Sequence, residues 1–491
     1  MPLILPGNVG SATAATGYNV ANSLRFNDDS TDYLSRTPGS DGNRKTWTFS
    51  TWIKRGNIGI GNPINVFGGE DGASRYSDIM IGTPSGADDT FWFKQDTGTV
   101  AELRSTMKLR DTAAWYHLVF TYDSTDSTAA DRMKMYVNGV RLTSFVTNTN
   151  AGENVDSYVN TSGDPNYIGI YQASSKKLDA YLCETVLIDG TALAADSFGE
   201  FDSDSGIWKP IDVSGLTFGT NGFYMEYKES GTGTDASGMG ADTSGNDLNF
   251  AVNNFTAIDQ TTDTCTNNFA TWNPLYKNGS ETLVYTEGNT NSSNQPAGAN
   301  FEGAATIGMT SGKWYAEIKN TAANAYARIG ITGSPAESAR LDKTPGFYAD
   351  DYTIYSYNGN LVNNNSASSY AAAYTSNGDI IGIAVDLDNN KIYFSKNGAW
   401  ANGSGAWGSS TFNAATGAAT IAASNLASEE AYFFVIGDAD GGTSHKFNGN
   451  FGNPSYSTGT NQDGNDRGNF AYAVPSGFLS LCTANLSEAL S

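Results

Sequence analysis

The chain of 491 residues has only three cysteines, Cys183, Cys265 and Cys482. They are far apart and odd in number, so they cannot form a disulfide framework, and there is no C-x-x-C metal pattern. Cys183 stands in an apolar run, where we expect a buried small hydrophobic residue. So few thiols indicate folding in a reducing cytoplasm.

Basic residues are also scarce: 28 Lys and Arg stand against 51 Asp and Glu, a net charge of −23. Nucleic acids and anionic membranes bind clustered basic side chains, so neither is an expected partner. No run approaches the roughly 18 apolar residues that cross a bilayer. The start carries Pro2 and Pro6 and no basic segment, which makes a poor signal peptide. We therefore expect no membrane insertion, and release from a cell by lysis.

Histidine is nearly absent: His117 and His445 are the two in the chain, and they fall in different expected domains. This pattern excludes a histidine-rich zinc site and disfavours a nucleophile–histidine triad. A retaining glycosidase needs two carboxyl groups about 5–5.5 Å apart. The chain has no E-x-D-x-x-E run, and Glu184 and Glu317 are lone acids on expected strands. We therefore expect no catalytic residues and no enzyme activity.

What is abundant is glycine, with 55 residues, and aromatic residues, at 12%, while charged residues reach only 16%. Long helical patterns are absent. This composition is typical of an all-β protein with many turns, and the length suits two or three domains.

Two segments predict β-hairpins of the same kind. In Gly378–Trp400, apolar residues alternate with a period of two from Ile380 onward, a second strand follows from Lys391, and Asn397-Gly398 suits a tight turn. Residues Trp115–Val140 repeat this order and end their second strand at Asn138-Gly139. Two separate antiparallel sandwiches explain the repetition better than one large sheet.

Composition divides the chain into five parts. Residues 1–21 read as an extended N-terminal arm, which docks either into a neighbouring subunit or onto its own domain. Residues 22–228 predict a first sandwich. Residues 229–280, rich in Gly, Ser, Thr, Asp and Asn, predict a linker with room for one extra strand. Residues 281–482 predict a second sandwich, and 483–491 a C-terminal tail.

The first sandwich resembles the laminin G-like, concanavalin A-like family, and the second resembles the SPRY (B30.2-like) family. The first resemblance rests on WTFSTWIKR, WYHLVFTYD, MYVNGVRL, YIGIY and LDAYLCETVLIDGTAL. The second rests on SGKWYAEI, IGITG, GDIIGIAVDLDNNKIYFSKNG and FNGNFG. Each covers about 200 residues, with its motifs in the family's order. The resemblances imply an all-β fold of two antiparallel β-sandwich (jelly-roll) domains.

Both ends of the chain resemble tailed-phage structural proteins, through MPLILPGNVGSATAATGYNVANSLRFND and AYAVPSGFLSLCTANLSEALS. This implies a virion protein made in the host cytoplasm, most simply a tail fibre or appendage that displays lectin-like modules. Its expected partners are other virion proteins, further copies of itself, for example in a trimer, and a host-surface glycan or protein. The alternatives are a capsid decoration or head-fibre protein and a secreted carbohydrate-active enzyme.

Aromatic residues are the candidates for a binding surface, since flat rings in loops suit sugar stacking or protein contact. They are Tyr352, Tyr355, Tyr357, Trp400 and Trp407; packing in the sandwich core is the alternative.

We expect no cofactor. Calcium is the one cation that could bind to some of the Asp-rich loops. The candidate ligands are Asp386 and Asp388 in DLDNN, and Asp438 and Asp440 in GDADGG. Neither loop matches a complete EF-hand pattern, and Asp-rich hairpin turns are the simpler interpretation.

Overall fold

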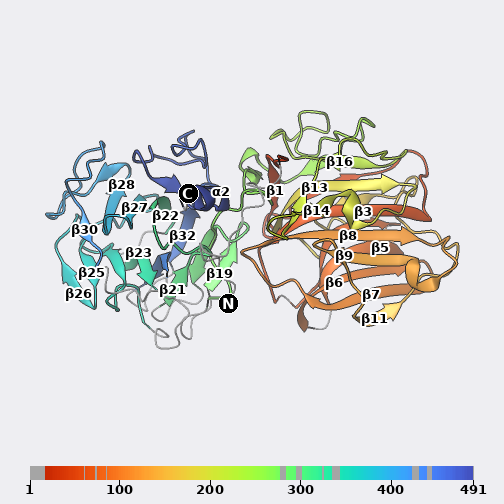
Figure 1. The fold of residues 1–491 in the computed structure, drawn as a ribbon, viewed down its shortest axis with the longest axis horizontal. Helices are drawn as coiled ribbons and strands as arrows, with labels where there is room; N and C mark the ends of the chain where they lie inside the picture. Colours follow the sequence, from red (N-terminus) through yellow and green to blue (C-terminus); the bar gives the residue numbers. More distant parts are fainter. Residues whose placement is uncertain are drawn as a thin grey trace. The chain divides into compact units, whose positions relative to one another are not determined.

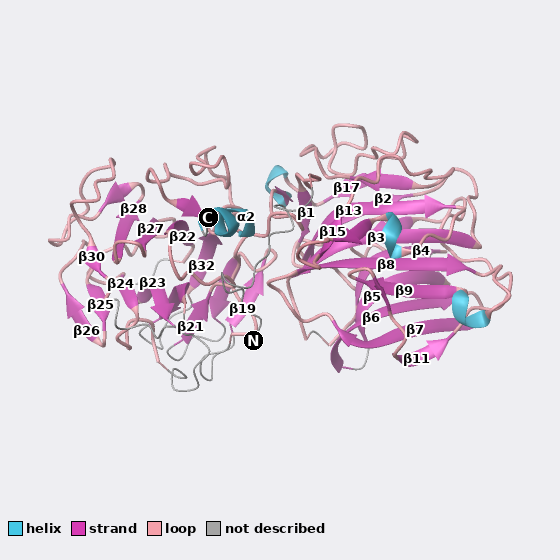
Figure 2. Ribbon diagram, viewed as in Figure 1, coloured by secondary structure: helices cyan, strands magenta, loops and turns pink. Residues whose placement is uncertain are grey.

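The computed structural model describes residues 17–59, 61–71, 75–83, 86–276, 283–294, 301–322, 326–333, 343–422, 431–438 and 445–489. The chain divides into an N-terminal unit, Ser11–Asn267, and a C-terminal unit built from Asn268–Ser491 (Figure 1). Nearly all regular structure is β-strand, which confirms the predicted all-β class (Figure 2). Within the described ranges, no helix has the length and apolar character needed to cross a membrane.

The N-terminal unit contains two large antiparallel sheets. The strands of the first, here the β13 sheet, are β1 (Ser23–Phe26), β3 (Thr46–Arg55), β8 (Trp115–Asp123), β9 (Met133–Val137), β10 (Val140–Arg141), β13 (Ala180–Asp189), β16 (Phe223–Met225) and β18 (Gln260–Thr261). Their order is β10-β9-β8-β3-β13-β1-β18, and β16 also pairs with β13.

The strands of the second, here the β5 sheet, are β2 (Tyr33–Arg36), β4 (Ile64–Glu70), β5 (Tyr76–Thr83), β6 (Gly86–Asp96), β7 (Val100–Lys108), β11 (Phe145–Thr149), β12 (Asn166–Ile168) and β17 (Ala251–Asn253). Their order is β11-β7-β6-β5-β4-β12-β2-β17. Between and beside the sheets lie a small pair, β14 (Gly199–Phe201) and β15 (Trp208–Pro210), and the 3-10 turns η2 (Ala129–Asp131), η3 (Ala195–Ser197) and η4 (Ala257–Asp259).

The inner faces of the two sheets pack against each other through aromatic side chains. Phe49 of β3 stacks on Phe67 of β4 with ring centroids 4.5 Å apart, and Phe120 of β8 stacks on Phe93 of β6 at 4.0 Å. These rings come from opposite sheets, so they form the core of a sandwich.

The outer face of the β13 sheet is buried as well. Trp52, Trp115 and Tyr181 project from this sheet into a second apolar cluster, which Trp208 and Val20 complete. In the described part of the unit, the chain therefore covers this face itself and leaves no ligand site on it.

Both predicted hairpins are present. Strands β8 and β9 pair over Leu118–Tyr122, and Asn138 and Gly139 follow with φ of 47° and 78°. In the C-terminal unit, the segment from Ile380 repeats this geometry, with φ of 49° at Asn397 and 80° at Gly398. Positive φ at two successive residues is the requirement that Asn-Gly meets in a tight turn.

The predicted linker is wrong for residues 229–267, which belong to the N-terminal unit. Met239, Phe250 and Phe255 are buried in its core, and β17, the extra strand allowed for there, pairs with β2. The apolar residues stand singly among Gly, Ser and Thr, so composition concealed them. Residues 268–276 belong to the C-terminal unit, where Trp272 is fully buried.

The described part of the N-terminal arm docks onto its own unit, the second of the two alternatives. The backbone N–H of Val20 donates to the Thr266 hydroxyl at 3.1 Å, and the Tyr18 hydroxyl donates to Glu184 at 2.9 Å. Residues 1–16 of the arm lie outside the described ranges.

The C-terminal unit also contains two sheets. The β22 sheet consists of β19 (Leu283–Thr286), β20 (Asn291–Asn294), β22 (Lys313–Asn320), β27 (Ile380–Asp386), β28 (Lys391–Lys396), β29 (Ala399–Trp400), β30 (Ala419–Thr420), β32 (Lys446–Asn450) and β33 (Leu479–Ser480). The order is β19-β20-β32-β22-β27-β28-β29, with β30 paired to β28 and β33 paired to β22.

The β23 sheet of the same unit consists of β21 (Phe301–Ala304), β23 (Ala327–Gly333), β24 (Tyr352–Tyr355), β25 (Leu361–Asn363), β26 (Ser366–Ser368) and β31 (Tyr432–Asp438). Its order is β21-β31-β23-β24-β25-β26. Alternate residues of both sheets, such as Ile383 of β27 and Ile329 of β23, share one buried core. The predicted tail at 483–491 includes a helix, α2 (Thr483–Ala489), and Leu486 of this helix joins the core because it lies on the apolar face.

Candidate functional site

A groove lies over one edge of the β5 sheet in the N-terminal unit. Ser35 of β2 pairs in register with Tyr167 of β12 on one side and with Ala251 of β17 on the other. Leu34 and Ile168, the next residues along these strands, point into the core. Side chains alternate along a strand, so Ser35, Tyr167 and Ala251 share the outer face of the sheet. The groove has a volume of about 540 Å³, and its lining is Ser35, Arg36, Thr37, Pro165, Tyr167, Thr234, Asn249 and Ala251.

The groove combines one flat ring with several fixed hydrogen-bonding groups. The half-buried Tyr167 ring packs edge-on against Tyr33 at 6.0 Å. Arg36 alternates with Ser35 along β2, and its guanidinium donates to the Asn221 side chain at 3.1 Å, away from the face that carries Tyr167. Asn249 accepts from the backbone N–H of Asp242 at 2.9 Å. A ring with nearby donors and acceptors suits a ligand that has both an apolar face and many hydroxyl groups.

Two carboxyl groups lie deeper in the same sheet. Glu70 of β4 and Asp78 of β5 are fully buried, and the Lys176 ammonium group lies 4.0 Å from Asp78. Burial raises the pKa of Glu70 to about 7, and burial together with Glu70 raises the pKa of Asp78. Lys176 also lies 3.6 Å over the Tyr171 ring. The pair is thus closed off from solvent and does not form the floor of the groove.

His117 is equally enclosed, in agreement with its expected structural role. Trp208 donates its indole N–H to His117 Nδ1 at 3.0 Å, which leaves Nε2 to donate to the Ser50 hydroxyl at 2.8 Å. Burial lowers the pKa of His117 to about 3, so the ring is neutral. Ser50 is itself buried, so this Ser–His contact does not reach a substrate.

In the C-terminal unit, Tyr355 and Tyr357 form an exposed cluster with Tyr326, hereafter the tyrosine cluster. The Tyr326 and Tyr357 rings are parallel within 2° at 6.5 Å, and Tyr355 lies 6.1 Å from Tyr357. Tyr357 is 60% exposed. The Arg328 guanidinium lies 5.2 Å over the Tyr355 ring and donates to the Pro345 carbonyl at 2.9 Å. This arrangement offers aromatic surface and a fixed cation to a partner.

Tyr326 was not among the predicted residues. It stands one residue before β23, whose Arg328 pairs in register with Tyr355 of β24. Strand pairing, which no local pattern reveals, brings the three rings together.

The other three predicted aromatic residues pack in the interior. Tyr352 is 3% exposed, and its hydroxyl accepts the backbone N–H of Ala422 at 2.8 Å. Trp400 is 9% exposed in β29 and meets Phe412 edge-on at 4.9 Å. Trp407 is half-buried against the core. For Trp400 the alternative of core packing holds, because its segment folds back and pairs with β28.

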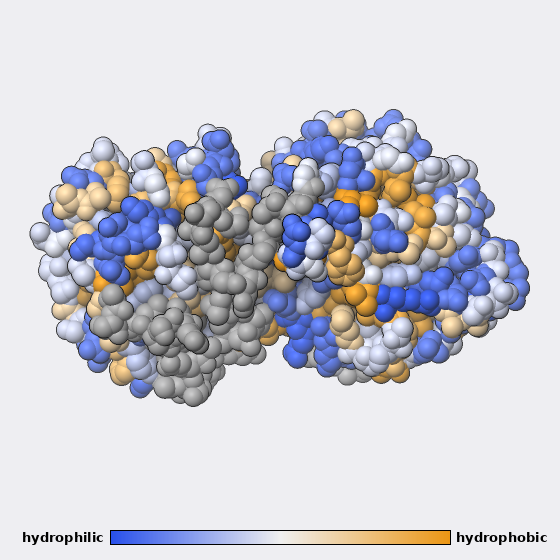
Figure 3. All heavy atoms as spheres, in the orientation of Figure 1, coloured by the Kyte–Doolittle hydropathy of each residue, from blue (hydrophilic) through white to orange (hydrophobic). Residues whose placement is uncertain are grey.

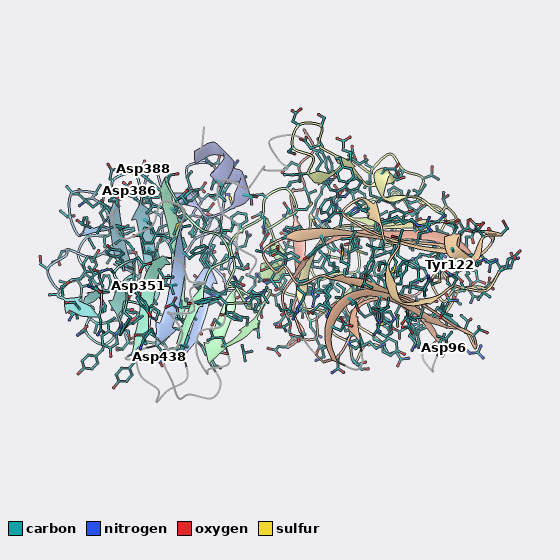
Figure 4. The ribbon with its side chains drawn as sticks, turned by 60° about the horizontal axis from the view of Figure 1, so that its bottom comes forward. Asp96, Tyr122, Asp351, Asp386, Asp388 and Asp438 are labelled. Carbon is teal, nitrogen blue, oxygen red and sulfur yellow. The ribbon has the colours of Figure 1, made fainter. Side chains whose placement is uncertain are left out.

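The predicted calcium ligands do not converge. Asp386 accepts from the Asn389 backbone at 3.0 Å and pairs with Lys313 at 3.1 Å, while Asp388 accepts the Gly312 N–H at 2.8 Å. Asp438 is buried against His445, apart from the other two (Figure 4). Asp440 lies outside the described residues. Over the described ranges, no group of three or more His, Cys, Asp and Glu side chains is placed to hold a metal ion.

Exposed apolar side chains are interspersed with polar ones on the surface (Figure 3). In the described part of the N-terminal unit, the large exposed ones are Val100, Met107, Val140, Val146, Phe201 and Ile258. Val146 is on β11, the last strand at one side of the β5 sheet, and β7 beside it carries Val100 and Met107.

Two family models match the chain. Residues 28–196 match the laminin G model described as the concanavalin A-like lectin/glucanases superfamily, and residues 313–423 match the SPRY domain. A search of curated proteins gave no match.

Among solved structures, the SPRY domain of human HERC1 is 17% identical, with 36% of this chain and 96% of that chain covered and a TM-score of 0.27. A putative carbohydrate binding protein from Bacteroides ovatus is 15% identical, with 50% and 60% covered and a TM-score of 0.33. A heptameric SAP-like pentraxin from Limulus polyphemus is 15% identical, with 36% and 80% covered and a TM-score of 0.27. By the two family models, the chain contains a laminin G-like, concanavalin A-like domain followed by a SPRY domain.

Proposed function

We propose that this protein binds a glycan in the groove of its laminin G-like unit and does not cleave it. The observation that carries the proposal is the placement of the Tyr167 ring with Ser35 and Asn249 in a groove of about 540 Å³. Cavities that hold small ligands commonly measure about 300–1,000 Å³. The family description, which names lectins, supports the same ligand class.

The ligand we propose is an uncharged or weakly charged polysaccharide. The chain carries a net charge of −23, and that field repels a strongly anionic polymer. In the groove, the Tyr167 ring would stack on the apolar face of a sugar, and Ser35 and Asn249 would form hydrogen bonds with its hydroxyl groups. Binding without cleavage is supported by the burial of Glu70 and Asp78, whose carboxyl groups are closed off from solvent and do not line the groove.

The biological setting we propose is a phage particle, with the protein in a tail fibre or similar appendage that contacts the host surface. The support is the resemblance of the two ends of the chain to tailed-phage structural proteins. We propose further that it assembles as a homo-oligomer, and the exposed Val146 on the outer strand β11 is a suitable apolar contact. Gold-labelled antibody on particles distinguishes tail from head, and light scattering gives the oligomer mass.

The binding proposal is tested on a glycan array, followed by titration of the best ligand. We expect Tyr167→Ala to weaken binding at least about tenfold, equivalent to about 1.4 kcal/mol. Tyr357→Ala, which removes an exposed ring from the C-terminal unit, is the matched control and should bind the glycan normally. Equal affinity of wild type and Tyr167→Ala would refute the groove as the site. New reducing ends in the incubated glycan would instead indicate a carbohydrate-active enzyme.

A further inference from the structure

Two of the three cysteines, distant in sequence, meet in the N-terminal unit. Cys183 of β13 is fully buried, Cys265 follows β18 and is half-buried, and their sulfur atoms are 3.6 Å apart. They are separated by 82 positions in the chain. Both are free thiols. The sequence gives no sign of this contact, because it depends on residues 262–267 lying over the outer face of the β13 sheet.

The position of Cys265 is set by its neighbours and not by the thiol contact alone. Lys54 and Asp263 form a buried ion pair with a separation of 2.8 Å. On the other side of Cys265, the Thr266 hydroxyl accepts from Val20 N–H at 3.1 Å and donates to the Val20 carbonyl at 3.2 Å. Residue 265 is therefore held between two anchored residues, directly above Cys183.

The sulfur separation is close to that of a bond. A disulfide has an S–S length of about 2.05 Å, so the two atoms need to approach by about 1.5 Å, a distance that side-chain rotation can supply. The unit ends at Asn267, two residues after Cys265. A bond here would fix the segment by which the chain leaves the N-terminal unit, together with the docked arm at Val20.

We propose that Cys183 and Cys265 form a disulfide when the protein meets a disulfide oxidant of the glutathione type, and that this bond locks residues 262–267 onto the sandwich. The thiolate of Cys265, the more exposed of the two, attacks one sulfur of oxidised glutathione and displaces a glutathione thiolate. Cys183 then loses its proton and attacks the mixed disulfide at Cys265, which releases the second glutathione thiolate. Two electrons pass from the cysteines to the oxidant, and two protons are released to solvent.

The reaction is slow in a reducing cytoplasm and at neutral pH. Burial, followed by the hydrogen bond from Cys183, raises the pKa of the Cys265 thiol. Since the thiolate is the nucleophile, its rate of attack rises with pH. The protein therefore stays reduced where it is made and is cross-linked after exposure to an oxidising medium.

The test uses the full-length protein at pH 8.5 with either oxidised or reduced glutathione. Free thiols are counted after denaturation, and tryptic peptides are analysed by mass spectrometry. We expect the count to fall from three to one, with Cys183 and Cys265 joined in a peptide pair. Cys482→Ser, which alters a cysteine of the C-terminal unit, should form the same bond, whereas Cys265→Ser should form none.

The second readout is hydrogen exchange of residues 262–267, which we expect to slow at least tenfold on oxidation of the wild type. Three thiols remaining after prolonged oxidation, or glutathione retained on Cys265 alone, would overturn the disulfide. A disulfide that leaves the exchange of this segment unchanged would overturn its role as a lock. None of these outcomes depends on the glycan site.

Discussion

Glu317 of β22 is a buried acid that links several segments of the C-terminal unit. It is fully buried and accepts four hydrogen bonds. Its Oε2 accepts from Ala471 N–H at 2.8 Å and Asn450 Nδ2 at 3.0 Å, and its Oε1 accepts from Tyr472 N–H at 2.9 Å and the Tyr315 hydroxyl at 3.1 Å. One carboxylate thus joins β22 to β32 and to the segment at 471–472.

The substitution Glu317→Gln keeps the size of the side chain but replaces one acceptor oxygen with an NH₂ group that cannot accept. Two of the four donors then lose their acceptor in a buried site. Each buried donor left without a partner costs about 1–3 kcal/mol, so we expect a loss of about 4 kcal/mol. For a unit of this size, that corresponds to a fall of about 10 °C in Tm.

Differential scanning calorimetry of the full chain measures the effect, and pulse proteolysis shows which unit melts in each transition. Only the transition of the C-terminal unit should move. The matched control is Asp388→Asn: this exposed acid accepts a single hydrogen bond, from Gly312, and the amide can still accept it. A shift for Glu317→Gln no larger than that of the control would refute the reasoning.

Three further outcomes follow from the structure. Burial raises the pKa of Glu184 from 4.5 to about 7, partly opposed by hydrogen bonds from Tyr224 and Tyr18. The folded state therefore keeps a proton that the unfolded state loses, so this group contributes about 3 kcal/mol of stability that is lost as the pH rises from 4.5 to above 7. Urea titrations should show that Glu184→Gln reduces the pH dependence of stability by this amount, while the part due to Glu70 remains. Gly139→Ala should destabilise the N-terminal unit by about 3 kcal/mol in calorimetry, because Gly139 has φ +78° and a Cβ there would lie 2.4 Å from the Trp208 ring. The control Gly98→Ala should cost only about 1 kcal/mol, because Gly98 has φ +93° but a Cβ there would meet open space. Tyr357→Ser should change stability by less than about 0.5 kcal/mol, since the ring is 60% exposed; a larger loss in calorimetry would show that the tyrosine cluster is part of the core.

The hairpins were predictable because their information is local. A period of two sets which face of Ile380–Asp386 is buried, and Asn397-Gly398 supplies the two positive φ angles that close the turn. The same rules identified Trp115–Val140, although the two segments share few residues. The two sandwiches were predictable because the motifs of each family follow one another in the family's order along the chain.

The sites were harder to predict, because each depends on residues that only the fold brings together. The groove joins β2, β12 and β17. Ser35 and Tyr167 are more than eighty positions apart in the chain, and so are Tyr167 and Ala251. Trp400 is followed in the sequence by small and Gly-rich residues that are typical of a loop, but its ring packs on Phe412 in the interior. Segment 229–267 was mistaken for a linker since its few core residues, such as Phe250, are isolated among small polar ones.

The most direct test of the account is a structure of the full protein with an oligosaccharide selected on the array. We expect an intact sugar in the groove, with a ring lying on Tyr167 and a hydroxyl group near Asn249. A sugar bound at the tyrosine cluster instead, or a cleaved sugar beside opened Glu70 and Asp78 side chains, would contradict it.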